Sequence, residues 1–380
     1  MQKRIKVCLI TPNHIVTNPR LVKEAIALEK HGFAVHLVFT MPDGKGSLLD
    51  FAILNDHPAW TYDVLKWDGQ GLRQKAVRFK SGLRRKLALL AFRFFGKKQL
   101  SPFLVNRHYS WQIRKAVAAQ ADLYIAHNLG ALPVAQIAAQ RLKAKSGFDA
   151  EDFHRHESSD DLNNEDVRIK TAVEEKYLAS VHYCTAASPL IGDAYQRLIR
   201  GLNPVPILNV FQRKVSPPQK RVGECVRLFW FSQTLGPNRG LETILDAIHQ
   251  VGSCCFELHL LGNPSIGYQA ELEKRASKLG LIDCLRFYDP VPEATIFDLA
   301  STCDIGLASE TGTPYNREIC LTNKIFTYIQ SGLAVLASDT LAQRQLFSRF
   351  PDAGKLYQNN DPSSLASALA FYAKHQQELM

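Results

Sequence analysis

A polar loop in the C-terminal half of the chain precedes a short helix that the sequence predicts at residues 323–331. The free N–H groups at the start of such a helix favour a phosphate, and Lys324 in its first turn adds a full positive charge. Carboxylate and amide side chains of the loop would bind hydroxyl groups beside this anion. The pattern therefore predicts a site for a sugar attached to a nucleotide diphosphate, with an ordinary solvated loop and helix as the alternative. The side chains of this candidate site are Glu310, Asn316, Arg317, Glu318, Asn323 and Lys324.

A second candidate phosphate site lies at residues 232–242 (SQTLGPNRGLE), between a predicted strand and a predicted helix. Gly236 and Gly240 allow a tight turn there, and Arg239 lies at the helix entrance, where a diphosphate would meet N–H groups and a guanidinium together. An ordinary turn with a surface arginine would have the same pattern. Because both segments belong to one predicted domain, we expect Arg239 and Lys324 to bind the same diphosphate.

Strands and helices alternate along the chain and would position these loops. Residues 5–10 read as a buried strand, and residues 33–39 read as the next strand. Between them a helix begins at Asn18–Pro19, with Asn18 as the N-cap and Pro19 as the first helical residue. A strand–helix–strand unit of this kind is typical of a parallel doubly wound sheet. A second alternating series begins at residue 226. The sequence thus predicts an α/β protein with two doubly wound Rossmann-like domains facing a cleft, with ligands at the carboxyl ends of the strands.

The expected boundaries follow from a polar, proline-containing stretch that reads as an interdomain linker. Neither a GxGxxG nor a GxxxxGK[ST] motif follows any predicted strand, so a dinucleotide-dependent dehydrogenase and a P-loop enzyme are both disfavoured. The expected parts are residues 1–211, the linker 212–224, a second domain at 225–360 and a terminal helix within 361–380.

Polar residues also end two predicted strands of the first domain. His127 ends one strand, and Asp149, Glu151 and Asp152 end the next. His127 would bind a sugar hydroxyl or support proton movement, since an imidazole titrates near neutrality; a hydrogen-bonded strand-end histidine is the equal alternative. The nearby segment FHRHE (153–157) lacks the spacing and the further ligands of a metal site, so we expect no metal.

The net charge of +10 is concentrated in one window. Between Asp68 and Asp122 there are thirteen Lys or Arg and no Asp or Glu, and an apolar stripe recurs there at helical spacing within residues 72–98. Such a basic amphipathic helix suits an anionic membrane surface. No nucleic-acid-binding module accompanies this helix, so nucleic acid is not expected as a partner. The alternative to a membrane-binding helix is a core helix with a solvated basic face. The stripe consists of Leu72, Ala76, Phe79, Leu83, Leu87, Leu90 and Phe94.

The eight cysteines form no CxxC pair and no zinc spacing, and several lie in apolar strand patterns. The sequence shows neither a signal peptide nor an apolar run long enough to cross a bilayer. We therefore expect a reduced, cytoplasmic protein that is held peripherally on the inner face of the cell membrane.

Several segments together resemble the GT-B glycosyltransferases of family 4. They are RGLETILDA, FELHLLG, NKIFTYIQSGLAVLASD, DLYIAHNLGALPVA and the following DAED. The resemblance implies that a nucleotide sugar binds the C-terminal domain, that the acceptor binds the N-terminal domain, and that the anomeric configuration is retained. It also implies that the terminal helix crosses back to the first domain.

This chain departs from the family at its charged positions. Ile319 and Thr327 stand where the family has its carboxylate pair, so Glu310 is expected to replace the first carboxylate and Thr327 the ribose contact. Thr234 and Arg239 stand where the family has its phosphate-binding arginine and lysine. The donor site that the resemblance implies is therefore altered.

The expectation is a retaining glycosyltransferase without a further cofactor. Its nucleotide-diphosphate sugar would be the donor substrate, and a lipid-linked or polysaccharide acceptor of surface or extracellular polysaccharide biosynthesis would receive the sugar. The alternatives are a nucleotide-sugar epimerase of the same fold and a non-catalytic, membrane-associated homologue.

Overall fold

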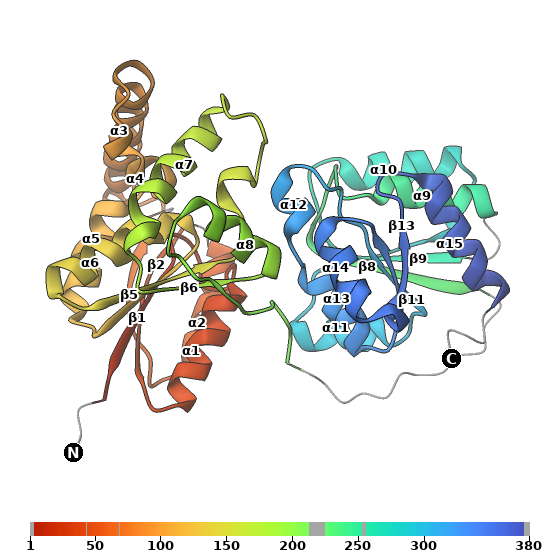
Figure 1. Cartoon of the computed structure of the whole chain (residues 1–380), viewed down its shortest axis with the longest axis horizontal. Coiled ribbons are helices and arrows are strands. Elements are labelled where there is room, and N and C mark those ends of the chain that lie inside the picture. Colours follow the sequence, from red (N-terminus) through yellow and green to blue (C-terminus); the bar gives the residue numbers. More distant parts are fainter. Residues whose placement is uncertain (1–3, 43, 68, 213–224, 253–255, 376–380) are drawn as a thin grey trace. The chain divides into compact units, whose positions relative to one another are not determined.

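The computed structural model describes residues 4–42, 44–67, 69–212, 225–252 and 256–375 (Figure 1). The chain divides into two compact units, Met1–Ile207 with Pro314–Asn316 and Leu208–Thr313 with Arg317–Met380. The predicted linker at 212–224 lies outside the described residues except for Gln212.

The first unit contains a fully parallel sheet in the order β3-β2-β1-β4-β5-β6-β7. Its interior strand β1 is an apolar run whose Val7, Leu9 and Ile10 are completely buried, as expected for a strand covered on both faces. The strands are β1 (Lys6–Ile10), β2 (Ala34–Met41), β3 (Thr61–Lys66), β4 (Leu123–His127), β5 (Lys145–Ala150), β6 (Tyr183–Ala186) and β7 (Val205–Pro206).

Helices connect these strands, and the first begins as predicted. The Asn18 side chain accepts a hydrogen bond from the N–H of Leu21 at 3.0 Å, and Pro19 opens the helix. The helices of this unit are α1 (Pro19–Lys30), α2 (Gly44–Asp56), α3 (Leu72–Phe95), α4 (Pro102–Val105), α5 (Tyr109–Ala119), α6 (Leu132–Leu142), α7 (Glu165–Tyr177) and α8 (Pro189–Leu198).

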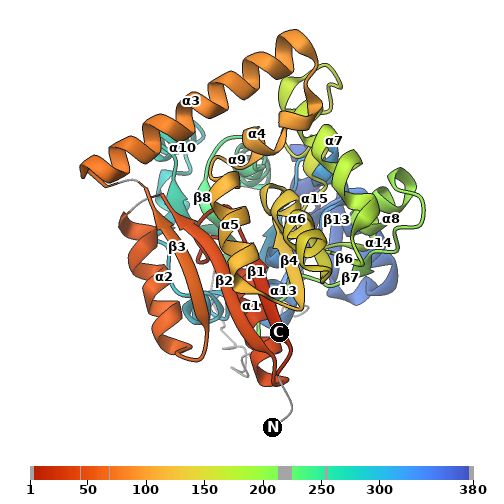
Figure 2. The same ribbon diagram turned by 90° about the vertical axis from the view of Figure 1, so that its left-hand side faces the viewer.

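Helix α3 is the basic amphipathic segment, and it projects beyond the sheet (Figure 2). It packs through Ala88 and Phe92 against a small cluster that includes Leu104 and Ile169. The predicted apolar stripe lies on other positions of the helix and is exposed to solvent: Phe79 is 72% exposed. The alternative that the stripe is the buried face of a core helix is therefore wrong.

The second unit contains a parallel sheet in the order β10-β9-β8-β11-β12-β13. Its strands are β8 (Val226–Leu235), β9 (Phe256–Pro264), β10 (Leu285–Tyr288), β11 (Ile305–Ala308), β12 (Ala334–Ser338) and β13 (Gly354–Tyr357). The helices after β8 are α9 (Leu241–Val251), α10 (Tyr268–Lys278), α11 (Glu293–Ala300), α12 (Tyr315–Ile319), α13 (Asn323–Gln330), α14 (Leu341–Arg349) and α15 (Pro362–Lys374).

The two sheet orders confirm the predicted fold class of two doubly wound α/β domains. The terminal helix packs within the second unit, and its expected crossing to the first domain stays a prediction. In α15, Leu365, Leu369 and Tyr372 are buried in the apolar core of the second unit, together with side chains of α9. This helix therefore belongs to the second unit.

Candidate functional site

Glu310 lies just beyond β11 and is the centre of a charged cluster in the second unit. Its side chain is only 3% exposed and pairs with Lys324 at 2.8 Å and with Arg317 at 3.0 Å. The Thr322 hydroxyl also donates to it at 3.2 Å. Burial raises the pKa of Glu310, but Lys324 and Arg317 outweigh this effect and leave the pKa below its ordinary value. The carboxylate is therefore ionised.

Arg239 belongs to the same cluster. Its guanidinium donates to the Ser232 hydroxyl at 3.0 Å, and its pKa is lowered first by burial and then by the positive charge of Arg317. The Lys324 ammonium lies 5.1 Å from the centre of the Trp230 ring. Three cations and one carboxylate leave this cluster with a net positive charge, which suits a diphosphate.

Two helices start at this cluster, and their first N–H groups have no side-chain cap. Helix α9 follows Gly240, whose φ of +79° is in the left-handed region that favours glycine. A Cβ at Gly240 would lie 2.9 Å from that of Ser309, so only glycine allows this close approach. Helix α13 begins at Asn323 after Thr322, which also makes no capping bond. Both starts therefore offer N–H groups to an anion.

The sequence placed Arg239, Arg317, Lys324 and Glu310 in two candidate phosphate-binding segments, which lie together in one charged cluster. It did not predict the separate role of Glu318, which accepts a hydrogen bond from the N–H of Leu341 at 2.9 Å, at the first residue of α14. Gly236 follows β8, and a Cβ there would meet only Ser265 at 3.5 Å, an ordinary contact.

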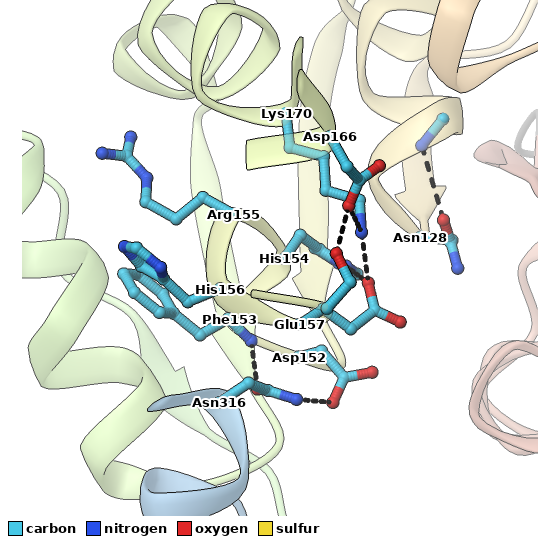
Figure 3. Close-up of polar contacts among 12 residues, drawn as sticks. Asn128, Asp152, Phe153, His154, Arg155, His156, Glu157, Asp166, Lys170 and Asn316 are labelled. Atoms are coloured by element: carbon cyan, nitrogen blue, oxygen red, sulfur yellow. Dashed lines mark hydrogen bonds and ion pairs between the residues drawn. The ribbon is translucent and has the colours of Figure 1, made fainter. Parts of the chain in front are cut away.

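Thr327 and Asn316 are placed differently from their expected roles beside the donor. Thr327 is 1% exposed, and its hydroxyl donates to the carbonyl of Asn323 within its own helix at 2.9 Å. Asn316 lies in the first unit, where it accepts from the N–H of Phe153 at 2.7 Å and donates to Asp152 at 2.8 Å (Figure 3). The local sequence around Asn316, in the short helix α12, gives no signal for such a distant partner.

His127 is the centre of a second charged cluster, in the first unit. Its Nε2 lies 2.7 Å from the Glu24 carboxylate, and its Nδ1 lies 3.4 Å from Asp149 and 3.5 Å from Glu151. Burial lowers the pKa of His127, but the three carboxylates raise it well above its ordinary value. The imidazole is therefore a buried cation at neutral pH.

Arg20 completes this second cluster. Its guanidinium binds both oxygens of Asp149, at 2.7 Å and 2.6 Å, and the Thr185 hydroxyl donates to the same carboxylate at 2.6 Å. Sequence reasoning missed Arg20 and Glu24, although their separation of four residues places both on one face of α1. His127 is 1% exposed at its side chain, whereas Glu24 and Glu151 are 30% and 19% exposed. A ligand would therefore meet the two carboxylates rather than the imidazole itself.

His127, Asp149 and Glu151 also have the geometry of three ligands that could hold a metal ion, since their ligand atoms all lie within 4.8 Å of one another. The donor set fits a metal poorly, because Arg20 already occupies both oxygens of Asp149 and the raised pKa of His127 keeps a proton on the imidazole. His154 and His156 of the FHRHE segment are not part of this group.

No helix among the described residues is both long enough and apolar enough to cross a membrane.

No family model matches the sequence, and no curated protein sequence matches it. Solved structures do match the fold across almost the whole chain. Anabaena HepE in complex with UDP and glucose gives a TM-score of 0.70 at 18% identity, covering 99% of this chain and 92% of that one. Sucrose-phosphate synthase from Thermosynechococcus elongatus gives 0.67 at 14% identity, covering 99% and 91%. A candidate UDP-N-acetylglucosamine 2-epimerase from Listeria monocytogenes gives 0.57 at 11% identity, covering 100% and 90%.

Proposed function

We propose that the protein is a glycosyltransferase that takes its sugar from a nucleotide diphosphate sugar bound to the second unit. The observation that carries the proposal is the cluster of Arg239, Arg317 and Lys324 at two uncapped helix starts. UDP and glucose in the HepE structure support the choice of a nucleotide sugar as the ligand.

In the proposed reaction, the bond between the sugar and the diphosphate breaks while the acceptor hydroxyl attacks the sugar and passes its proton to the leaving diphosphate. Negative charge develops on the leaving diphosphate, and the three cations with the N–H groups of α9 and α13 stabilise it. Glu310 holds Lys324 and Arg317 in place through its ion pairs. We propose retention of the anomeric configuration, because the family that the sequence resembles transfers sugars in this way.

We further propose that the acceptor is lipid-linked or a growing polysaccharide, and that α3 holds the protein on an anionic membrane surface. On α3, Leu72 is 87% exposed and Phe94 is 75% exposed, and eight Lys or Arg share the helix with this exposed apolar stripe. An apolar stripe with basic flanks fits the interface of a bilayer that carries negative charge.

The direct test is transfer of a labelled sugar from purified nucleotide sugars, with UDP-glucose first, to a lipid-linked oligosaccharide extract. Formation of a labelled glycan with release of the nucleoside diphosphate is expected. The stereochemistry of the new bond tests retention. Incubation with the donor alone separates the epimerase alternative, because an epimerase converts the donor sugar without an acceptor. Absence of nucleotide-sugar binding would instead favour a non-catalytic homologue.

A further inference from the structure

A cavity of about 420 Å³ lies within the first unit, and none of the charged residues of the cluster around His127 lines it. Helices α3, α4 and α7 form its walls, together with the turns that follow β4 and β5. Its volume is within the range of roughly 300–1,000 Å³ that is usual for small-molecule sites. The residues that carry the argument are Arg85, Leu104, Asn128, His154, Glu157 and Lys170.

We propose that this cavity binds a neutral sugar ring of the acceptor. The identification of this sugar as part of the acceptor rests on the proposed function. Binding of a sugar ring to the cavity can nevertheless be tested without a donor.

The lining of the cavity has two chemically different sides. Leu104 of α4 and Ile169 of α7 give an apolar wall, while His154, Glu157 and Lys170 give a polar wall. A pyranose ring has the same division, since its C–H groups form an apolar face and its hydroxyl groups project from the rim. Ligand sites of this kind combine apolar contact with a few polar groups that fix the orientation.

His154 has an unused hydrogen-bonding atom in this wall. Its side chain is 1% exposed, its Nδ1 lies 3.5 Å from Glu157, and its Nε2 has no partner among the described residues. A buried polar nitrogen without a partner is unfavourable. A sugar hydroxyl in the cavity would supply the missing partner.

Three carboxylates, of Glu157, Glu165 and Asp166, line the cavity with the cations Arg85 and Lys170, and this balance favours a neutral ligand over a phosphate. The Lys170 ammonium lies between two carboxylates, 3.1 Å from Glu157 and 2.9 Å from Asp166 (Figure 3). Glu165, which also lines the cavity, pairs with Arg93 of α3. The lysine is thus already neutralised, while carboxylate oxygens remain as acceptors for hydroxyl groups.

The turn after β4 is held in an unusual conformation at the edge of the cavity. Asn128 has φ +71° and ψ +149°, a combination that non-glycine residues rarely adopt, and its side chain accepts from the N–H of Gly130. A Cβ at Gly130 would lie 2.7 Å from the carbonyl of Val105, so glycine allows the turn to approach α4. Backbone strain of this kind is concentrated at binding and active sites.

Helix α3 connects this cavity with the proposed membrane surface. Arg85 and Leu89 of α3 line the cavity, while Phe79 and Leu87 belong to the exposed stripe of the same helix. At 3.6 residues per turn these two sets of side chains lie on opposite sides of α3, so a sugar in the cavity would be separated from the stripe by about one helix diameter, roughly 10–12 Å.

The test is saturation-transfer NMR on the full chain without any nucleotide. The probes are the methyl glycosides of glucose, galactose, mannose and N-acetylglucosamine, with inorganic phosphate as a competitor. We expect at least one glycoside to bind and phosphate not to displace it. His154→Phe removes the unused nitrogen and should weaken binding about tenfold or more. Val105→Trp fills the cavity from its edge and should abolish binding.

The matched control is Glu175→Gln, an exposed position of α7 outside the cavity, which should leave binding within about twofold. Thermal unfolding checks that each variant is folded. The proposal is overturned if no glycoside binds, if phosphate displaces the glycoside, or if binding survives in folded Val105→Trp. Binding of UDP-glucose, measured separately, should be unchanged in all three variants. Glycoside binding without any nucleotide-sugar binding would support the cavity while contradicting the proposed function.

Discussion

Glu310 and Lys324 form a buried ion pair, with their charged atoms 2.8 Å apart and both side chains less than a tenth exposed. Burying two charges is costly unless each is well paired. Here Arg317 and Thr322 also bind the carboxylate, and the Trp230 ring lies beneath the ammonium. The pair therefore fixes the position of Lys324 at the start of α13, where its charge can meet a phosphate.

The first prediction concerns the diphosphate. Arg239→Ala and Lys324→Ala should each weaken binding of UDP-glucose roughly ten- to a hundredfold, because a charge-assisted hydrogen bond contributes about 1.5–3 kcal/mol. Isothermal titration calorimetry measures the change. The control is Arg344→Ala, which removes an exposed cation of α14 in the same unit. Unchanged affinity in both cluster variants would contradict the phosphate assignment.

The second prediction separates the two glutamates. Glu310→Gln leaves Lys324 without its buried partner, so we expect a loss of about 3–5 kcal/mol in the free energy of unfolding and a large loss of turnover. Glu318→Gln weakens only the contact with the start of α14 and should cost about 1 kcal/mol with mild loss of turnover. Urea unfolding and transfer rates measure the two effects. A larger loss of turnover in Glu318→Gln would show that Glu318, and not Glu310, is the carboxylate that the reaction needs.

The third prediction concerns pH and the His127 cluster. The pKa of His127 is raised in the folded protein above its ordinary value of 6.5, so protonated His127 stabilises the fold. This contribution is fully present below pH 6.5 and is lost as the pH rises through the raised pKa. Asp149 has a lowered pKa because Arg20 and His127 outweigh its burial, so its contribution is lost at acidic pH instead.

The variant that tests this prediction is His127→Gln. The difference in unfolding free energy between the native protein and His127→Gln should be largest below pH 6.5 and should shrink at alkaline pH. Urea unfolding between pH 5 and pH 10 measures it. A difference that is independent of pH would mean that His127 is not charged in the folded protein.

The sequence was sufficient to predict most of the fold, because its signals are local. The buried run of β1 and the cap at Asn18 are each determined by a few neighbouring residues. The charged cluster of the second unit was predictable for a related reason, since loops at the carboxyl ends of parallel strands meet at one edge of the sheet.

The remaining features depend on contacts between distant segments. The pairing of Arg20 with Asp149 joins residues that are 129 positions apart, and the bond from Phe153 to Asn316 joins residues that are 163 positions apart. The family resemblance implies a ribose contact for Thr327, yet its hydroxyl donates to the carbonyl of Asn323 within its own helix. The sequence pattern specifies which residue types are present, whereas burial decides which of them can reach a ligand.

The last prediction concerns α3 and the membrane. The protein should bind vesicles that contain anionic lipid and should be released partly as the salt concentration rises, because exposed charges are screened. Replacement of Lys75, Lys80 and Lys86 by Gln should weaken binding roughly a hundredfold, since each basic residue near such a surface contributes about 1 kcal/mol. These three lysines are exposed and do not line the cavity. Replacement of Phe79 and Leu83 by Ser should instead remove the part of the binding that resists salt.

The control for the α3 lysine variant replaces Lys30, Lys274 and Lys278, exposed lysines of α1 and α10, and changes the net charge equally. Sedimentation with anionic and neutral vesicles measures all four proteins. Equal binding to both kinds of vesicle, or equal losses in the two lysine variants, would show that α3 is only a solvated helix of the first unit.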